Sequence, residues 1–266
     1  MVRLRDLSME YVEIQGESVP KIGLGTWNMR GQACYRATLS ALELGYRHID
    51  TAEMYGNESE VGRAIADSGL TRSELFLVTK VSASHLSHDG VLEAAENSLQ
   101  RLGLDAIDLY LVHWPNDMIP VEKTMAGMNE LVDSGKVRRI GVSNFSLRQL
   151  KQAEAASSAR IFTNQIEYFI GQTEEPMLQY CQENGVLLTA YSPLDRGRLG
   201  QNQALEAIAD EHGVTVAQVA LRWLIQQENV VAIPKSVHPD RQRENLDVFG
   251  FELSSEQMAQ LGSAYR

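Results

Sequence analysis

Four residues that could carry acid–base chemistry lie near the ends of short apolar runs. The segment GYRHIDTAEMY (45–55) contains a run that ends on Asp50, and Tyr55 follows five residues later. Lys80 ends the run FLVTK, and His113 follows LYLV. A phenol has a reference pKa of about 10, but a nearby ammonium group stabilises the phenolate and lowers that value. A buried lysine needs a carboxylate partner, so Asp50, Lys80 and Tyr55 could together form a tunable proton donor.

This set of residues suits the reduction of a carbonyl group. His113 could hydrogen-bond the carbonyl oxygen and orient it while Tyr55 protonates the forming alkoxide. Hydride would have to come from a cofactor, because no side chain provides one. Each residue also has a simpler explanation. Asp50 could cap a helix, and Lys80 could be exposed at a strand end. His113 could be a core residue, and Tyr55 could be an aromatic residue of a loop. Their occurrence at the same end of the predicted strands favours one shared site.

The elements that must position these residues alternate between apolar runs and amphipathic stretches. The runs are 22–25, 46–49, 75–79, 107–112, 137–142, 162–166, 186–190 and 230–233. The amphipathic stretches are 33–44, 57–68, 89–102, 120–134, 146–155, 173–183, 215–226 and 239–247. Eight strand–helix units predict parallel pairing and an α/β (β/α)8 TIM barrel, with an open doubly wound sheet as the competing architecture.

Two further features add to the simple barrel. The segment EYVEIQGESVP (10–20) alternates around Gln15 and Gly16, which predicts an N-terminal β-hairpin. Residues 203–212 and 254–261 predict two extra helices, the second with Ser254 as its N-cap. We expect chemistry at the C-terminal ends of the barrel strands, where polar residues follow nearly every run.

Composition narrows the class of protein. The chain has 266 residues, 44% of them hydrophobic, which suits a single barrel domain over 1–266. A net charge of −11 argues against nucleic acid as the main partner. Only Cys34 and Cys181 are present, the N-terminus has no long apolar region, and no run approaches 18 apolar residues. We therefore expect a cytoplasmic protein with no signal peptide and no membrane partner, and a monomer is the default.

These motifs resemble the aldo-keto reductase family. GYRHIDTAEMYGNESEVG (45–62) is similar to its first signature, and IPKSVHPDRQREN (233–245) is similar to its C-terminal signature. LVTKV, LVHWP, GVSNF, NQIEY and YSPL match in order and spacing, so the resemblance covers roughly residues 10–262. It implies a (β/α)8 barrel, NADPH as cofactor and no metal. It also implies a catalytic tetrad, with Tyr55 as proton donor, made of Asp50, Tyr55, Lys80 and His113.

The resemblance also implies a cofactor site. Its residues would be Ser143, Asn144, Gln165, Tyr191, Ser192, Leu194, Lys235, Ser236, Val237, Arg241, Glu244 and Asn245. The first three would hold the nicotinamide carboxamide, Tyr191 would stack on the ring, and the last two match positions near adenine. Lys235, Ser236 and Arg241 offer two cations and a hydroxyl, which suits the 2′-phosphate that distinguishes NADPH from NADH.

The predicted substrate pocket is open. Trp27, Met54 and Trp114 would line it beside Tyr55 and His113. The loop WPNDMIPVEK is short and the chain ends soon after its last helix, which resembles the bacterial branch of 2,5-diketo-D-gluconate and methylglyoxal reductases. We expect small aldehydes, dicarbonyls such as methylglyoxal, or keto sugars as substrates.

Two other classes of function compete with this interpretation. A metal-dependent barrel hydrolase would use Asp50 and His113 as ligands, but the sequence lacks the usual His-x-His start and a second cluster of His and carboxylates. A cofactor-binding, non-catalytic regulatory subunit could keep the same fold without turnover. The complete tetrad argues against that alternative.

Overall fold

The computed structural model describes residues 9–199 and 203–263. The first eight residues, on which part of the prediction about the N-terminus rests, lie outside this range. So do residues 264–266 of the tail that the substrate prediction used. The single domain over 1–266 therefore stays a prediction.

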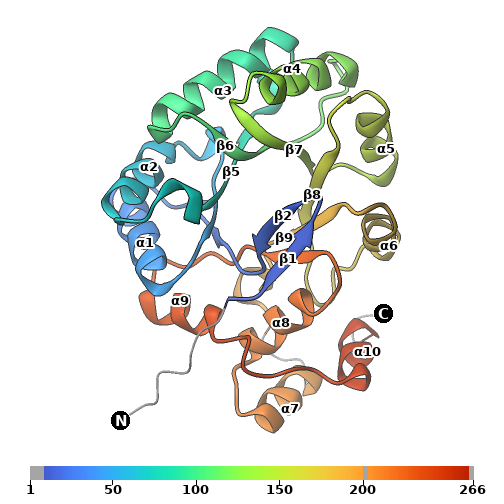
Figure 1. Cartoon of the computed structure of the whole chain (residues 1–266). Coiled ribbons are helices and arrows are strands. Elements are labelled where there is room, and N and C mark those ends of the chain that lie inside the picture. Colours follow the sequence, from blue (N-terminus) through green and yellow to red (C-terminus); the bar gives the residue numbers. More distant parts are fainter. Residues whose placement is uncertain (1–8, 200–202, 264–266) are drawn as a thin grey trace.

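Within the described residues, eight parallel strands form one curled sheet, and neighbours in the sheet are neighbours in the chain (Figure 1). The strands are β3 (Leu24–Gly25), β4 (His48–Asp50), β5 (Phe76–Val81), β6 (Ile107–Val112), β7 (Val137–Ser143), β8 (Ile161–Glu167), β9 (Leu187–Tyr191) and β10 (Val230–Ala232). Ile22 forms a parallel bridge with Ala232, and the amide of Gly23 donates to the Ala232 carbonyl at 2.9 Å. These contacts join the last strand to the first, so the sheet is the predicted closed barrel and not an open doubly wound sheet.

The predicted hairpin is present and lies across the barrel axis (Figure 1). β1 (Tyr11–Ile14) pairs antiparallel with β2 (Glu17–Pro20), and Gln15 and Gly16 between them have φ of 48° and 81°. Two residues at positive φ make the tight turn whose twist suits a hairpin. Val12, Ile14 and Val19 of the hairpin belong to the apolar cluster that fills the barrel interior. The other members of this cluster come from the barrel strands and are Phe76, Val78, Leu109, Leu111, Phe162, Leu187 and Val231. The hairpin thus covers the N-terminal end of the barrel and leaves the C-terminal end for the loops.

A ring of helices surrounds the sheet (Figure 1). It consists of α1 (Gly31–Leu44), α2 (Glu58–Asp67), α3 (His88–Leu102), α4 (Val121–Asp133), α5 (Leu147–Ala155), α6 (Glu175–Asn184), α8 (Val216–Ile225) and α9 (Pro239–Leu246). Their bounds lie within two residues of the predicted stretches. β5 and β6 are buried at every position because the interior covers one face and the helices cover the other. No helix of the described ranges combines the length and the apolar composition needed to cross a bilayer.

The two predicted extra helices are α7 (Gln203–His212) and α10 (Ser255–Ser263), which pack together outside the ring (Figure 1). The Nε2 of Gln257 donates to Glu211 at 3.1 Å, and the indole of Trp223 on α8 donates to the Met258 carbonyl at 3.1 Å. Ser254 accepts a hydrogen bond from the amide of Gln257 at 3.1 Å, so the predicted N-cap is confirmed.

Candidate active site

Asp50 and Lys80 form a buried ion pair at the C-terminal ends of two adjacent strands. Lys80 on β5 is fully buried, and its Nζ donates to Asp50 Oδ1 at 2.5 Å and to the Thr51 carbonyl at 2.7 Å. Gln165 on β8 donates to Asp50 Oδ2 at 2.7 Å. Both carboxylate oxygens are therefore engaged with side chains. Asp50 does not cap a helix, because Asn57 precedes α2.

Tyr55 lies beside this pair, on the short 3-10 turn η1 (Glu53–Tyr55) that follows β4. Its hydroxyl is 3.5 Å from Lys80 Nζ, and the ammonium lies 5.0 Å from the centroid of the phenol ring. Burial raises the pKa of Tyr55, and the opposing charge of Lys80 only partly offsets this effect. The prediction that Lys80 lowers this pKa is correct for the lysine's own contribution and wrong for the net direction, because desolvation is the larger effect.

Lys80 keeps its charge in spite of its burial. Desolvation works to lower the pKa of its ammonium group, but the Asp50 carboxylate and the Tyr55 phenol raise it above its usual value overall. A charged lysine can then stabilise a phenolate when the tyrosine gives up its proton.

His113 follows β6 and is 7% exposed. Its ring meets the ring of Tyr55 edge-on, with centroids 5.5 Å apart. Burial, followed by the positive charge of Lys80, lowers the pKa of His113 to about 3. The imidazole is therefore neutral near pH 7 and carries one N–H that can donate a hydrogen bond.

A hydrogen-bonded network extends from these residues along the rim to β9. Ser143 donates to the Gln165 carbonyl at 2.8 Å, and Asn144 donates to the His113 carbonyl at 3.0 Å and to Ser143 at 3.1 Å. Tyr191 donates to Asn144 Oδ1 at 2.8 Å. The structure thus places these four predicted cofactor residues next to the predicted tetrad.

A second group of predicted cofactor residues lies on the loop after β10 and on α9. Lys235 and Arg241 are exposed, and neither has a hydrogen-bond or ion-pair partner within the described ranges. Ser236 is buried and accepts from the His238 amide at 3.1 Å. Two unpaired cations on an acidic protein leave positive charge available to an anionic group.

The remaining predicted members of this group lie near those cations in the chain. Asn245 is buried and Val237 is partly buried. Glu244 accepts from the hydroxyl of Thr215 at 2.6 Å in an exposed hydrogen bond, so one of its carboxylate oxygens has a partner at the surface.

The loop after β9 contains backbone that is unusual for non-glycine residues. Ser192, Asp195 and Arg196 have φ of 48°, 43° and 53°, and Leu194 between them packs against the core. The guanidinium of Arg196 lies 5.8 Å from the Trp27 ring centroid, which ties this loop to the loop after β3. Positive φ at several non-glycine residues is typical of functional loops, but the sequence carries no motif that identifies Arg196 as part of the rim.

The three predicted substrate residues lie on rim loops and are exposed. Trp27 follows β3, Met54 lies on η1 and Trp114 follows His113, with exposed fractions of 53%, 59% and 46%. Exposed large apolar side chains gathered at one site are typical of a binding surface. The open substrate pocket itself stays a prediction.

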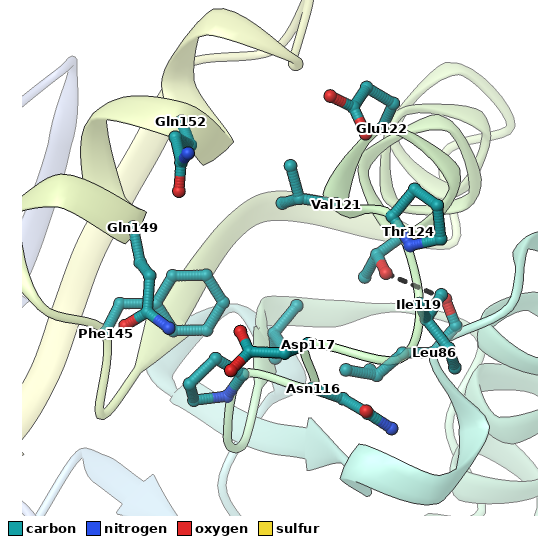
Figure 2. A pocket seen from close by; sticks show the side chains of 13 residues that line it. Leu86, Asn116, Asp117, Ile119, Val121, Glu122, Thr124, Phe145, Gln149 and Gln152 are labelled. Carbon is teal, nitrogen blue, oxygen red and sulfur yellow. Dashed lines mark hydrogen bonds between the residues drawn. The ribbon is translucent and has the colours of Figure 1, made fainter.

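A separate cavity lies beside the rim (Figure 2). It has a volume of about 260 Å³ and lies between the loop that leads into α4 and the start of α5, with walls that include Val112, Asp117, Val121, Phe145 and Gln149. Thr124 closes one side by donating to the Leu86 carbonyl at 2.8 Å. None of the predicted site residues lines this cavity.

The fold and the rim define a class: a closed (β/α)8 barrel whose C-terminal end carries a buried lysine–carboxylate pair, a tyrosine and a neutral histidine. Residues 21–266 match the sequence profile of the aldo/keto reductase family. The chain belongs to this family of oxidoreductases, as the motifs predicted.

Relatives and solved structures agree with this assignment. A glyoxal reductase of Bacillus subtilis is 41% identical over 244 residues, which cover 91% of this chain and 88% of the relative. A crystal structure provisionally identified as a 2,5-diketo-D-gluconic acid reductase B has a TM-score of 0.95 at 40% identity, covering 98% of this chain and 92% of its own. A Bombyx mori aldo-keto reductase solved in complex with NADP has a TM-score of 0.90 at 35% identity, covering 96% and 92%.

Proposed function

We propose that this protein reduces small aldehydes and ketones to alcohols with NADPH as the hydride donor. The observation that carries the proposal is the contact of Tyr55 with a charged Lys80–Asp50 pair beside a neutral His113. We also propose that it acts as a monomeric, cytoplasmic, single-domain enzyme, as the sequence led us to expect.

The side chains divide the work of protonating the substrate oxygen. A bound nicotinamide supplies the hydride that adds to the carbonyl carbon. Tyr55 donates its proton to the oxygen, and its raised pKa keeps the phenol protonated at neutral pH. Lys80 stabilises the phenolate that remains, and Asp50 holds the ammonium in place. His113 donates a hydrogen bond to the carbonyl oxygen and orients it.

The residues of the rim fit a phosphorylated dinucleotide. Lys235 and Arg241 would bind the 2′-phosphate, since both are exposed and free of partners in the described part of the chain. Ser143, Asn144 and Gln165 would hold the carboxamide, and Tyr191 would cover the nicotinamide ring. The other residues that would contact the cofactor are Ser192, Leu194, Ser236, Val237, Glu244 and Asn245. The complex of the Bombyx mori relative with NADP supports this choice of cofactor.

Small dicarbonyls and keto sugars are the proposed substrates. Trp27, Met54 and Trp114 present exposed apolar surface around the tetrad, and the loop between β6 and α4 is short. The names of the glyoxal reductase and the diketogluconic acid reductase among the similar proteins support this substrate class.

A metal-dependent hydrolase has less support. Lys80 and Gln165 donate to the two oxygens of Asp50, which leaves the carboxylate poorly placed to bind a cation. Activity that persists in the presence of a chelator would agree with this argument.

The test is oxidation of NADPH, with NADH in parallel, against glyoxal, methylglyoxal, keto sugars and a bulky steroid ketone. We expect turnover of several small carbonyls and a preference for NADPH. Tight NADPH binding without turnover of any carbonyl would favour the regulatory-subunit alternative, and strict activity on the steroid would contradict the substrate class.

Tyr55→Phe should lower kcat by about 10²–10⁴-fold and leave the Kd for NADPH nearly unchanged, because the phenol acts on the substrate.

A further inference from the structure

The turn that carries Tyr55 holds its tyrosine weakly. The hydrogen bonds from the Tyr55 amide to the Ala52 carbonyl (3.0 Å) and from the Gly56 amide to the Glu53 carbonyl (3.2 Å) are both local to this turn. The Tyr55 hydroxyl has its one polar contact in the described part of the chain with Lys80, at 3.5 Å, which is the outer limit of a hydrogen bond. Met54 on the same turn is 59% exposed. The Tyr55 ring also meets the His113 ring edge-on, with centroids 5.5 Å apart. The position of the phenol therefore depends on this ring contact and on the contacts that hold the turn against its neighbours.

Glu53 makes the strong side-chain contacts of this turn. Its Oε2 accepts from the backbone amide of Ser82 at 3.0 Å, and its Oε1 lies 2.6 Å from Nδ1 of His85. The Glu53 side chain is only 17% exposed, whereas His85 is 50% exposed. Solvent therefore screens the hydrogen bond from the Ser82 amide less than it screens the contact with His85. Both partners belong to the segment that follows β5, on the turn η3 (Ala83–His85) and immediately before it.

A second anchor holds the other end of the same segment. Asn57 is buried, accepts from the Thr51 hydroxyl at 2.7 Å and donates to the carbonyls of Thr26 and Met29 at 3.0 Å. These contacts tie the segment toward β3. The two flanks of the segment are also held to β5, the strand of Lys80: the Thr51 amide donates to the Val78 carbonyl at 2.9 Å, and the Thr79 hydroxyl donates to Glu58 at 2.6 Å. Within the turn itself, Glu53 makes the side-chain link to the segment after β5.

We propose that Glu53 is a positioning residue that sets the distance between the Tyr55 hydroxyl and Lys80. Glu53 lies two residues before Tyr55, and Ser82 lies two residues after Lys80. The link from Glu53 to Ser82 therefore joins the same two segments as the Tyr55–Lys80 contact. The catalytic consequence rests on the proposed carbonyl reduction, whereas the structural consequence does not.

Two substitutions of Glu53 distinguish the effect of its hydrogen bond with Ser82 from the effect of its negative charge. Glu53→Ala removes both contacts, and we expect kcat to fall about tenfold or more with the Kd for NADPH unchanged, since small misplacements of a reacting group are costly. The fall should be accompanied by a larger solvent isotope effect on kcat, because proton transfer becomes slower. Glu53→Gln keeps an acceptor for the Ser82 amide, so its kcat should stay within about threefold of the wild-type value.

The matched control is Glu130→Ala, which removes a glutamate–histidine contact of 3.0 Å with His88 between α4 and α3. We expect this variant to keep the wild-type kcat and solvent isotope effect. A similar loss in this control would show that removal of any glutamate–histidine pair lowers activity, and it would overturn the proposal.

Crystal structures of the wild type and of both Glu53 variants give a readout that needs no turnover. The Tyr55–Lys80 distance should lengthen to about 4 Å or more in Glu53→Ala and stay within hydrogen-bond reach in Glu53→Gln. An unchanged distance in Glu53→Ala would overturn the proposal whatever happens to kcat. If the wild type reduced no carbonyl, the proposed function would fail, and the crystallographic distances would still decide the role of Glu53.

Discussion

Lys80 remains charged in a fully buried position because three oxygen atoms surround its ammonium group. They belong to Asp50, Thr51 and Tyr55, at 2.5, 2.7 and 3.5 Å. The same burial that disfavours the charged form of Lys80 raises the pKa of Tyr55 and lowers the pKa of His113. The site therefore combines one permanent cation with two groups that stay neutral near pH 7. That combination suits the transfer of one proton to an oxygen atom.

Another single residue, Arg241, should make the protein prefer NADPH over NADH. We expect Arg241→Ala to weaken NADPH binding by about ten- to hundredfold, because a hydrogen bond to a charged group contributes about 1.5–3 kcal/mol. The Kd for NADH should change little, since NADH lacks the 2′-phosphate. Fluorescence titration of both cofactors measures the two constants.

Arg243→Ala is the matched control, because Arg243 lies on the same helix, is exposed and pairs with Asp240 at 3.5 Å. Its removal should leave both constants unchanged. Equal losses of affinity for NADPH and NADH in Arg241→Ala would show that Arg241 does not bind the 2′-phosphate.

Among the elements, α2 is held unusually close to its neighbours. Glu58 in its first turn is buried, accepts from the Thr79 hydroxyl on β5 at 2.6 Å and pairs with Arg101 on α3 at 2.6 Å. One turn further on, a Cβ at Gly62 would overlap the carbonyl of Leu102 at the end of α3. This close contact holds the helix that follows the Tyr55 turn against the rest of the barrel.

Gly62→Ala should therefore destabilise the protein. We expect a loss of about 1–3 kcal/mol in the free energy of unfolding, because the added methyl group must push two backbones apart. Gly262 on α10 is the control, since a Cβ there meets nothing nearer than the Trp223 ring at 3.8 Å. Gly262→Ala should be neutral or stabilising by up to about 1 kcal/mol, as helix propensity favours alanine. Urea denaturation compares the two variants, and equal effects would show that α2 and α3 can move apart.

For the molecule as a whole, buried neutral histidines make stability depend on pH. Burial lowers the pKa of His48, which lies under the hairpin 3.3 Å from the Pro20 carbonyl, and lowers that of His113 to about 3. In the unfolded chain both would titrate near the reference value of about 6.5. The unfolded state therefore binds more protons below that pH, and the folded state loses stability as the pH falls from about 6.5 toward the folded pKa values.

His113→Gln should flatten this dependence. Between pH 7.5 and pH 5, the wild type should lose about 2 kcal/mol more than this variant, which follows from about 1.4 kcal/mol per pH unit below 6.5. Urea denaturation at the two pH values measures the difference. Identical losses in both proteins would mean that His113 takes up a proton in the folded state.

The sequence by itself determined the elements and the end of the barrel where the site lies. Alternation around Gln15 and Gly16 predicted the hairpin, and alternating apolar runs and amphipathic stretches predicted every strand and helix of the barrel. These signals are local, since a strand's end and the side chain that follows it are neighbours in the chain. Asp50, Lys80, His113, Ser143 and their family motifs could therefore be assigned to one rim before any coordinates.

Only the tertiary structure decided how those residues act on one another. Closure of the ring depends on the bridge from Ile22 to Ala232, which no local pattern contains. The net direction of the Tyr55 pKa depends on how many atoms exclude water from the phenol, and the contact of Glu53 with Ser82 depends on how a turn packs against a distant strand. Desolvation and distances through space are properties of the packed molecule, because they sum over residues that the sequence places far apart.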